Sequence, residues 1–186
     1  MAKNLNNLVV RGFSGSIGGQ LVIKRSKSGR TIISNHPSFR ADRQFTPAQQ
    51  SQHLAFREAC AYAKTARDQE VYVHKAAGSD LSPYNLAVAD WLRPPEILQV
   101  DTGGWTGQPG KVIRIQALDD VQVKDVTLVI TDLAGALLEQ GPATAVDSLW
   151  WEYTTTATGT GSLKVTASAQ DLPGHVTQFT KLITKP

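Results

Sequence analysis

The spacing of apolar residues changes along the chain from short β-branched runs, through helical repeats, to short alternating runs. The first runs are QLVIKR (20–25) and RTIISN (30–35), and the segment SKSG between them ends in Gly29. Two β-branched runs around a glycine-containing turn are typical of a β-hairpin. Because a two-stranded hairpin is marginal alone in water, we expect it to pair or pack with a partner.

A helical repeat follows in TPAQQSQHLAFREACAYAKTARD. Thr46 and Gln49 have the spacing of a capping box, and Pro47 suits the first helical position. Apolar and small residues then recur at helical spacing, which predicts one small-residue stripe: Phe56, Ala59, Cys60, Ala63 and Ala66. Among these alanines, we expect the thiol of Cys60 to be buried and inert, since apolar surroundings suppress the thiolate.

A second helix is predicted in SPYNLAVADWL, with Ser82 as the N-cap and Pro83 at the first position. The segment RPPE (93–96) ends it, because neither proline can donate a backbone hydrogen bond. Beyond Pro95, short alternating runs are separated by Gly, Asp, Pro and Thr, which predicts the six or seven strands of a β-sandwich. The runs are EILQV, GKVIRIQAL, VTLVITD, LWWEYTT, GSLKVTASA and VTQFTKLIT. Trp150 or Trp151 is expected to supply its large central core residue.

Longer motifs carry a resemblance. Three segments of the N-terminal half resemble the opening of uncharacterised bacterial proteins, mostly from Bacteroidetes genomes and their phages, in which a G-x-[IVL]-G hairpin and a TPAQ helix recur. These segments are FSGSIGGQLVIKRSKSGRTIISNHP, TPAQQSQHLAFREACAYAK and SPYNLAVADWLRPPEI. Three segments of the second half resemble bacterial immunoglobulin-like domains: DDVQVKDVTLVITDLAGALLEQGPA, WWEYT and AQDLPGH. The resemblance implies an α+β N-terminal module of hairpin and helices (residues 1–93), followed by an all-β immunoglobulin-like sandwich (residues 94–186). It brings no catalytic residues.

Charge is distributed unevenly. Residues 1–75 contain 12 Lys and Arg against 4 Asp and Glu, a net +8, whereas residues 76–186 contain 7 against 12, a net −5. This asymmetry suits head-to-tail association, or a basic end that meets an anionic partner.

No apolar run reaches the length of a membrane span, so no membrane insertion is expected. The start lacks an apolar signal region, which indicates cytoplasmic synthesis before a final location in a virion or an extracellular assembly.

The basic residues of the N-terminal half form one candidate site. On a two-stranded ribbon they can follow a phosphate backbone, which makes nucleic-acid binding an alternative function. The members of this basic patch are Lys24, Arg25, Lys27, Arg30, Arg40 and Arg43. The glycines nearby do not have the spacing of a dinucleotide or phosphate loop, and a strand rather than a helix follows them.

Other chemistry is poorly supported. The four histidines share no ligand spacing, so no metal site, catalytic residue or cofactor is predicted. Two alternatives stay open. Asp119, Asp120 and Asp125 cluster in one predicted loop and leave a Ca²⁺ site to be tested. Trp105, in TGGWTGQPG, is a candidate ligand-facing aromatic if the protein is an adhesin or carbohydrate binder.

The main hypothesis is a non-enzymatic structural protein that self-assembles or docks into a large particle or filament. Unpaired hairpin edges and the preceding NLNNLVV segment template pairing with another chain. The predicted assembly interface consists of Leu8, Val9, Val10, Leu21, Ile23 and Ile32. Its partners are copies of the chain itself or other particle subunits, and the immunoglobulin-like domain is displayed outward.

Overall fold

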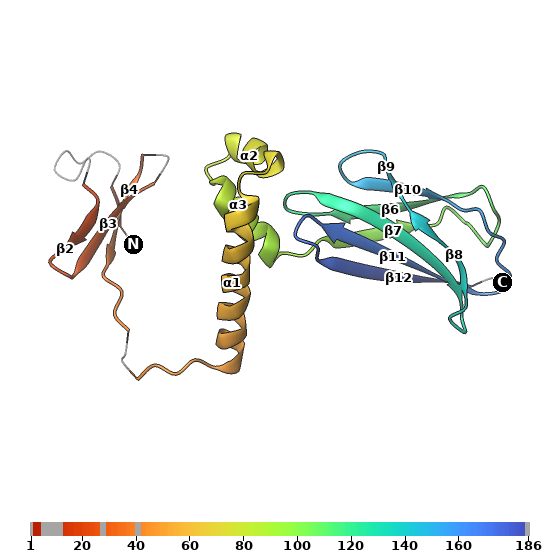
Figure 1. Cartoon of the computed structure of the whole chain (residues 1–186), viewed down its shortest axis with the longest axis horizontal. Coiled ribbons are helices and arrows are strands. Elements are labelled where there is room, and N and C mark those ends of the chain that lie inside the picture. The colour runs from red at the N-terminus through yellow and green to blue at the C-terminus, as the bar shows by residue number, and fades with distance from the viewer. Residues whose placement is uncertain (1, 5–12, 27–28, 40–41, 185–186) are drawn as a thin grey trace. The chain divides into compact units, whose positions relative to one another are not determined.

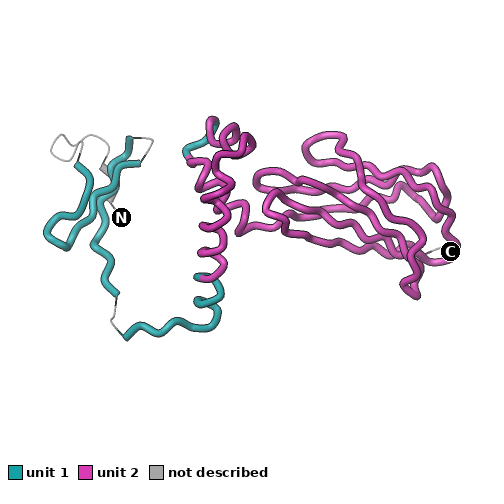
Figure 2. Tube along the Cα trace, viewed as in Figure 1, with its two compact units in different colours: residues 1–53, 78–80 teal, residues 54–77, 81–186 magenta. Residues whose placement is uncertain are grey.

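The structure is a computed structural model that describes residues 2–4, 13–26, 29–39 and 42–184. The chain divides into two compact units, Met1–His53 with Gly78–Asp80 and Leu54–Ala77 with Leu81–Pro186 (Figure 2). This division differs from the boundary at residues 93 and 94 expected from the sequence, because most of the helical segment belongs to the same unit as the sandwich.

The first unit contains an antiparallel four-stranded sheet in the order β1–β4–β3–β2 (Figure 1). The predicted hairpin is confirmed as β3 (Leu21–Arg25) and β4 (Thr31–Asn35). It is not isolated, however: β1 (Ala2–Asn4) pairs with β4, and β2 (Gly15–Ile17) pairs with β3. The hairpin edges expected to be unpaired are therefore both occupied within the chain.

Two neighbouring glycines explain how β2 reaches β3. The amide of Gln20 donates a 3.1 Å hydrogen bond to the carbonyl of Ile17, which closes a turn over Gly18 and Gly19. Both glycines have positive φ, +57° and +65°, as the central residues of a type I′ turn do. The glycine-rich segment is thus a strand connection, in agreement with the rejection of a phosphate loop.

Three helices follow. The capping box that opens α1 (Pro47–Ala66) is present: Thr46 N donates to Gln49 Oε1 (3.0 Å), and Gln49 N donates to Thr46 Oγ1 (3.3 Å). Its predicted stripe is buried only at the alanines, since Phe56 is exposed and Cys60 is half-buried rather than enclosed. The predicted cap of α3 (Pro83–Leu92) is confirmed as well, with Ser82 Oγ accepting from the amide of Asn85.

Helix α2 (Glu70–Ala77) was not predicted. It buries one residue, Tyr72, so it has almost no apolar stripe from which to recognise it. Its role becomes clear from packing. Tyr72 joins alanines and a leucine of α1 and α3 in a small cluster against which Val121 and Leu172, from two turns of the sandwich, also pack.

The rest of the second unit is a β-sandwich of two four-stranded sheets (Figure 1). One sheet has the order β5–β6–β10–β9, formed by Glu96–Asp101, Val112–Leu118, Trp150–Thr154 and Thr144–Ala145. The other has the order β12–β11–β7–β8, formed by Val176–Ile183, Leu163–Asp171, Val123–Asp132 and Leu137–Pro142. All six predicted runs are strands, and β8 and β9 are additional.

Alternation of buried and accessible residues along β6 and β11 fills the space between the sheets, as period-2 strands require. The buried aromatic side chains of the core are Trp105, which is 3% exposed, and Tyr153, while the half-buried Trp151 packs against this core and Trp150 is half-buried. On one flank, Lys181 Nζ of β12 donates a 2.8 Å hydrogen bond to the carbonyl of Val100 in β5. The last strand of the sandwich is therefore tied to its first.

Candidate functional site

The N-terminal sheet buries very little. In the described part of the first unit, Ile23 (4% exposed) and Thr31 are the buried residues. Five large apolar side chains remain exposed there: Phe13, Ile17, Leu21, Phe39 and Phe45. Ile17 and Leu21 lie directly opposite each other in the β2–β3 register, so they form an adjacent apolar pair on one face of the sheet. This pair is a candidate contact of the unit.

The predicted assembly residues do not form one surface. Leu8, Val9 and Val10 lie outside the described residues. Leu21 and Ile23 are two residues apart on β3, so their side chains lie on the same face of the sheet. Lys24 points to the opposite face, and Ile32, its partner on β4, lies on that face too. Leu21 is 40% exposed, but Ile23 is buried. The grouping expected from the sequence is therefore corrected: Leu21 is available for contact, Ile23 supports the sheet, and Ile32 belongs to its other side.

The basic patch is divided as well. Lys27 and Arg40 lie outside the described residues. Lys24 and Arg25 are both exposed but successive on β3, so they point to opposite faces. The guanidinium of Arg43 lies over the rings of Phe39 and Phe45, at 5.7 Å and 4.9 Å from the ring centroids. Arg30, directly before β4, is exposed. The four patch residues that the structure describes do not form a single continuous basic track along the hairpin.

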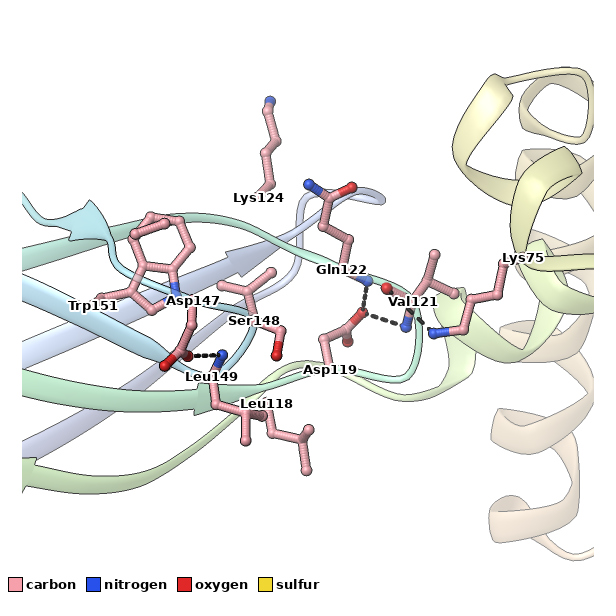
Figure 3. A pocket seen from close by; sticks show the side chains of 12 residues that line it. Lys75, Leu118, Asp119, Val121, Gln122, Lys124, Asp147, Ser148, Leu149 and Trp151 are labelled. Carbon is pink, nitrogen blue, oxygen red and sulfur yellow. Dashed lines mark hydrogen bonds between the residues drawn. The ribbon is translucent and has the colours of Figure 1, made fainter.

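The second unit has a cavity of about 500 Å³ between the turn that joins β6 to β7 and the segment before β10 (Figure 3). Its polar groups support the turns that line it. Lys75 of α2 donates to the carbonyls of Asp120 and Val121, and Asp119 Oδ2 accepts from the amides of Val121 (2.9 Å) and Gln122 (2.8 Å). At the other wall, Asp147 Oδ1 accepts from the amides of Leu149 and Trp150.

Asp147 shows how these carboxylates are used. The hydrogen bonds from the amides of Leu149 and Trp150 hold its pKa below the usual value. A carboxylate held this way is an ionised turn support and a poor proton acceptor. The cavity is therefore lined by carboxylates that support turns, by Lys75, which is bound to backbone carbonyls, and by the exposed Lys124.

The calcium hypothesis is not supported. Asp119 is bound to backbone amides, Asp120 forms a 2.5 Å ion pair with Arg93, and Asp125 is exposed on β7. Within the described residues, no three side chains of His, Cys, Asp or Glu are grouped as a metal site requires. The three aspartates are close in sequence, but Asp119 is bound to backbone amides of its turn, Asp120 to Arg93, and Asp125 lies on β7.

Trp105 is also corrected. Its ring lies in the core, and its indole nitrogen donates a 2.8 Å hydrogen bond to the carbonyl of Gln108. A buried indole with a satisfied donor cannot present a stacking face to a ligand. The glycine-rich loop folds back over the end of the sandwich, so the adhesin alternative loses the residue on which it was based.

Sequence reasoning missed a buried polar cluster where the helices meet the sandwich. Asp90 of α3 is fully buried, and its Oδ2 accepts a 2.5 Å hydrogen bond from the hydroxyl of Tyr72, which in turn lies 2.8 Å from the hydroxyl of Tyr62. A signal was present in NLAVADWL: Asp90 is four residues after Leu86 and three after Ala87, which places it on the buried face of the helix.

Comparisons with known proteins add little. No protein-family model matches the chain, and no protein of curated function matches it. Among solved structures, CopC from Methylosinus trichosporium OB3b is 14% identical over 48% of this chain and 91% of that chain, with a TM-score of 0.39. A conjugative transposon lipoprotein from Bacteroides eggerthii is 12% identical over 49% and 95%, with a TM-score of 0.28.

A Cellulomonas fimi endo-beta-1,4-mannanase double mutant is 19% identical over 48% of this chain, with a TM-score of 0.34. The chain spans 18% of that enzyme. Similarities this weak give no basis for transferring an activity. In the described residues, no helix combines the length and apolar character needed to span a membrane.

Proposed function

We propose that this chain is a non-enzymatic structural protein that assembles with further copies of itself through its N-terminal sheet, in a phage or phage-like particle or an extracellular filament. One observation carries the proposal: the described part of the sheet buries a single large apolar side chain, Ile23, and leaves Ile17 and Leu21 exposed side by side. A small unit with so little buried surface gains much of its stability from a partner.

The sheet also offers edges for this purpose. Strands β1 and β2 are its outer strands, each three residues long. An outer strand has backbone donors and acceptors on its free side that another strand can satisfy. We assign the partner as a second copy because the chain itself carries the complementary charge: its first 75 residues have a net +8 and the remainder a net −5. Exposed carboxylates such as Asp125 lie in the acidic part.

The sandwich fits the displayed part of such a subunit. Its two strand orders support an immunoglobulin-like arrangement, in which three or four strands of each sheet face one another across a shared core. Its core is complete in itself, with residues from both sheets buried. The unit therefore does not depend on the assembly contact for its own stability and can project from it.

The test is assembly of the purified full chain after nuclease treatment, followed by light scattering and negative-stain electron microscopy at low and high salt. We expect rings, tubes or filaments that weaken in high salt, because exposed charges are screened. Ile17→Asp and Leu21→Asp should prevent assembly, since each places a charge in the apolar contact. Leu133→Asp is the matched control, because Leu133 is 61% exposed but lies in the second unit.

Uniform monomers of the unmodified chain at all concentrations would contradict self-assembly. Equal loss of assembly in all three variants would show that the contact is not at the sheet. Retention of nucleic acid through purification, with assembly only in its presence, would instead favour the nucleic-acid alternative, for which exposed Lys24 and Arg25 are the candidates. Deleting residues 1–10 is a weaker test, because it removes β1 and uncovers the edge of β4.

A further inference from the structure

Two carboxyl groups from separate elements face each other where the helices meet the sandwich. Asp90 lies on α3, and Asp119 lies in the turn between β6 and β7. Each uses its Oδ2 in ordinary hydrogen bonds, from Tyr72 in one case and from backbone amides in the other. The remaining Oδ1 atoms are both buried, and the described residues supply neither with a donor. Their side chains interact directly with each other.

Two ionised carboxylates in this position would be doubly unfavourable. Each would leave a buried acceptor without a donor, and the two negative charges would repel each other outside bulk water. One proton removes both problems, because a protonated Oδ1 on one residue donates to Oδ1 of the other. Buried polar atoms without hydrogen-bond partners are rare in folded proteins, and one shared proton gives both Oδ1 atoms a partner.

We propose that Asp90 and Asp119 share one proton, and that this carboxyl–carboxylate hydrogen bond is a pH-sensitive link between the helices and the end of the sandwich. Asp90 holds the proton. It is the more deeply buried of the two, and Asp119 already uses its Oδ2 to accept hydrogen bonds from two backbone amides. Consistent with this, burial, with a further contribution from Asp119 and Asp171, raises the pKa of Asp90 to about 7 despite the Tyr72 hydrogen bond.

The other groups around the pair do not neutralise it. Tyr62 and Tyr72 face Asp90 from α1 and α2, and buried Asp171 adds negative charge from the end of β11. The basic side chains near this junction have other partners among the described residues. Lys75 is bound to the carbonyls of Asp120 and Val121, Arg93 to the carboxylate of Asp120, and His175 to Asp171. The pair is thus neutralised by a bound proton rather than by one of these basic side chains.

The direction of the pH effect follows. The pKa of Asp90 is higher in the folded protein than its ordinary value of 3.8. Its contribution to stability is fully present below about pH 4 and is lost as the pH rises through about 7, because the folded state binds the proton more tightly over that range. Above about pH 7 the two carboxylates repel each other, and the contact between α3 and the β6–β7 turn weakens.

The experiment follows the Asp carboxyl ¹³C signals of the full chain by NMR from about pH 4 to about pH 9, together with the unfolding equilibrium. We expect the Asp90 signal to titrate near pH 7, and the unfolding constant to rise up to about tenfold per pH unit between about pH 4 and pH 7, the limit for one proton. In Asp90→Asn, an amide replaces the protonated carboxyl as donor, so this pH dependence should disappear. Asp147→Asn, at an exposed turn, is the control that keeps it.

Titration of Asp90 near its ordinary value in the unmodified chain would overturn the proposal. That signal needs no variant, so the result stands even if Asp90→Asn fails to fold; Asp119→Asn is the second variant with the same expected loss of pH dependence. Added CaCl₂ that stabilises the unmodified chain above about pH 7, but not Asp90→Asn, would also overturn it, because the two carboxylates would then hold a cation instead of a proton.

Discussion

The hydroxyl of Tyr153 on β10 donates a 2.8 Å hydrogen bond to Oε1 of Glu139 on β8, and so connects the two sheets of the sandwich. Glu139 is 8% exposed and accepts further hydrogen bonds from Thr156 and from the amide of Ala157. Burial alone would raise the pKa of Glu139, but these donors outweigh it and hold the pKa below the usual 4.5. The carboxylate is therefore a buried anion that its neighbours stabilise.

Glu139→Gln should destabilise the protein by about 2 kcal/mol, because the amide nitrogen of glutamine cannot accept a hydrogen bond from the facing donors. Chemical denaturation monitored by tryptophan fluorescence measures the loss. The acid side of the stability curve should change too. The folded pKa of Glu139 is depressed, so its contribution is present above its ordinary pKa and disappears as the pH falls through the folded value. Equal stability of variant and parent at neutral pH would contradict this account.

Gly107 and Gly104 allow a matched test of backbone crowding. Both have positive φ, +102° and +73°, so alanine is strained at either position. A Cβ at Gly107 would also lie 2.3 Å from the carbonyl oxygen of Gly159, whereas a Cβ at Gly104 meets no atom within 4 Å. We expect Gly104→Ala to cost about 1 kcal/mol and Gly107→Ala several times more, measured by thermal unfolding. Equal costs would show that the close approach of the two loops is not maintained.

Ser82→Ala should lower stability by about 1 kcal/mol, because the amide of Asn85 loses the side-chain oxygen that accepts its hydrogen bond at the start of α3. Ser82→Asp keeps an acceptor at the cap and should restore most of the loss. Urea unfolding of the two variants beside the parent measures both effects. A similar loss of stability in Ser82→Ala and Ser82→Asp would show that the effect does not come from the cap hydrogen bond.

Tyr72→Phe tests the hydrogen bond that favours the ionised form of Asp90. Without this donor, the pKa of Asp90 should rise further above about 7, so the pH at which stability is lost should shift upward. The variant should also be less stable at every pH, since Oδ2 of Asp90 becomes a second buried acceptor without a donor. The carboxyl titration of Asp90 separates the two effects, and a downward shift would contradict the assigned direction.

Local patterns predicted local structure well. The β3–β4 hairpin, the Thr46–Gln49 capping box and the Ser82 cap each depend on residues a few positions apart, and the structure has them as expected. Strand β8 was missed because LLEQGP contains glycine, proline and a glutamate that is buried only through contacts with β10. A charged residue in a core position is visible only once its distant partners are known.

The candidate sites were less predictable for the same reason. Exposure of Trp105 depended on whether its loop folded back, which depends on hydrogen bonds from Thr155 Oγ1 to the carbonyl of Gln108 and from the amide of Gly159 to the carbonyl of Gly107. The basic residues were grouped by closeness in sequence, but neighbours on a strand point to opposite faces, so Lys24 and Arg25 separate. Asp90 acquires its significance from Asp119, 29 residues away in the sequence and on the other side of the junction.

The hydrogen bond between Lys181 and Val100 has a consequence for synthesis. It joins the final strand of the sandwich to the first, and β12 also pairs with β11 along its whole length. Strand β12 must therefore have left the exit tunnel of the ribosome before this unit can close, so the sandwich folds after its last strand has been translated. All four strands of the N-terminal sheet precede residue 36, and this sheet can form while the rest is still being made. On polysomes, the emerging chain would then display its pairing edges before its own sandwich exists.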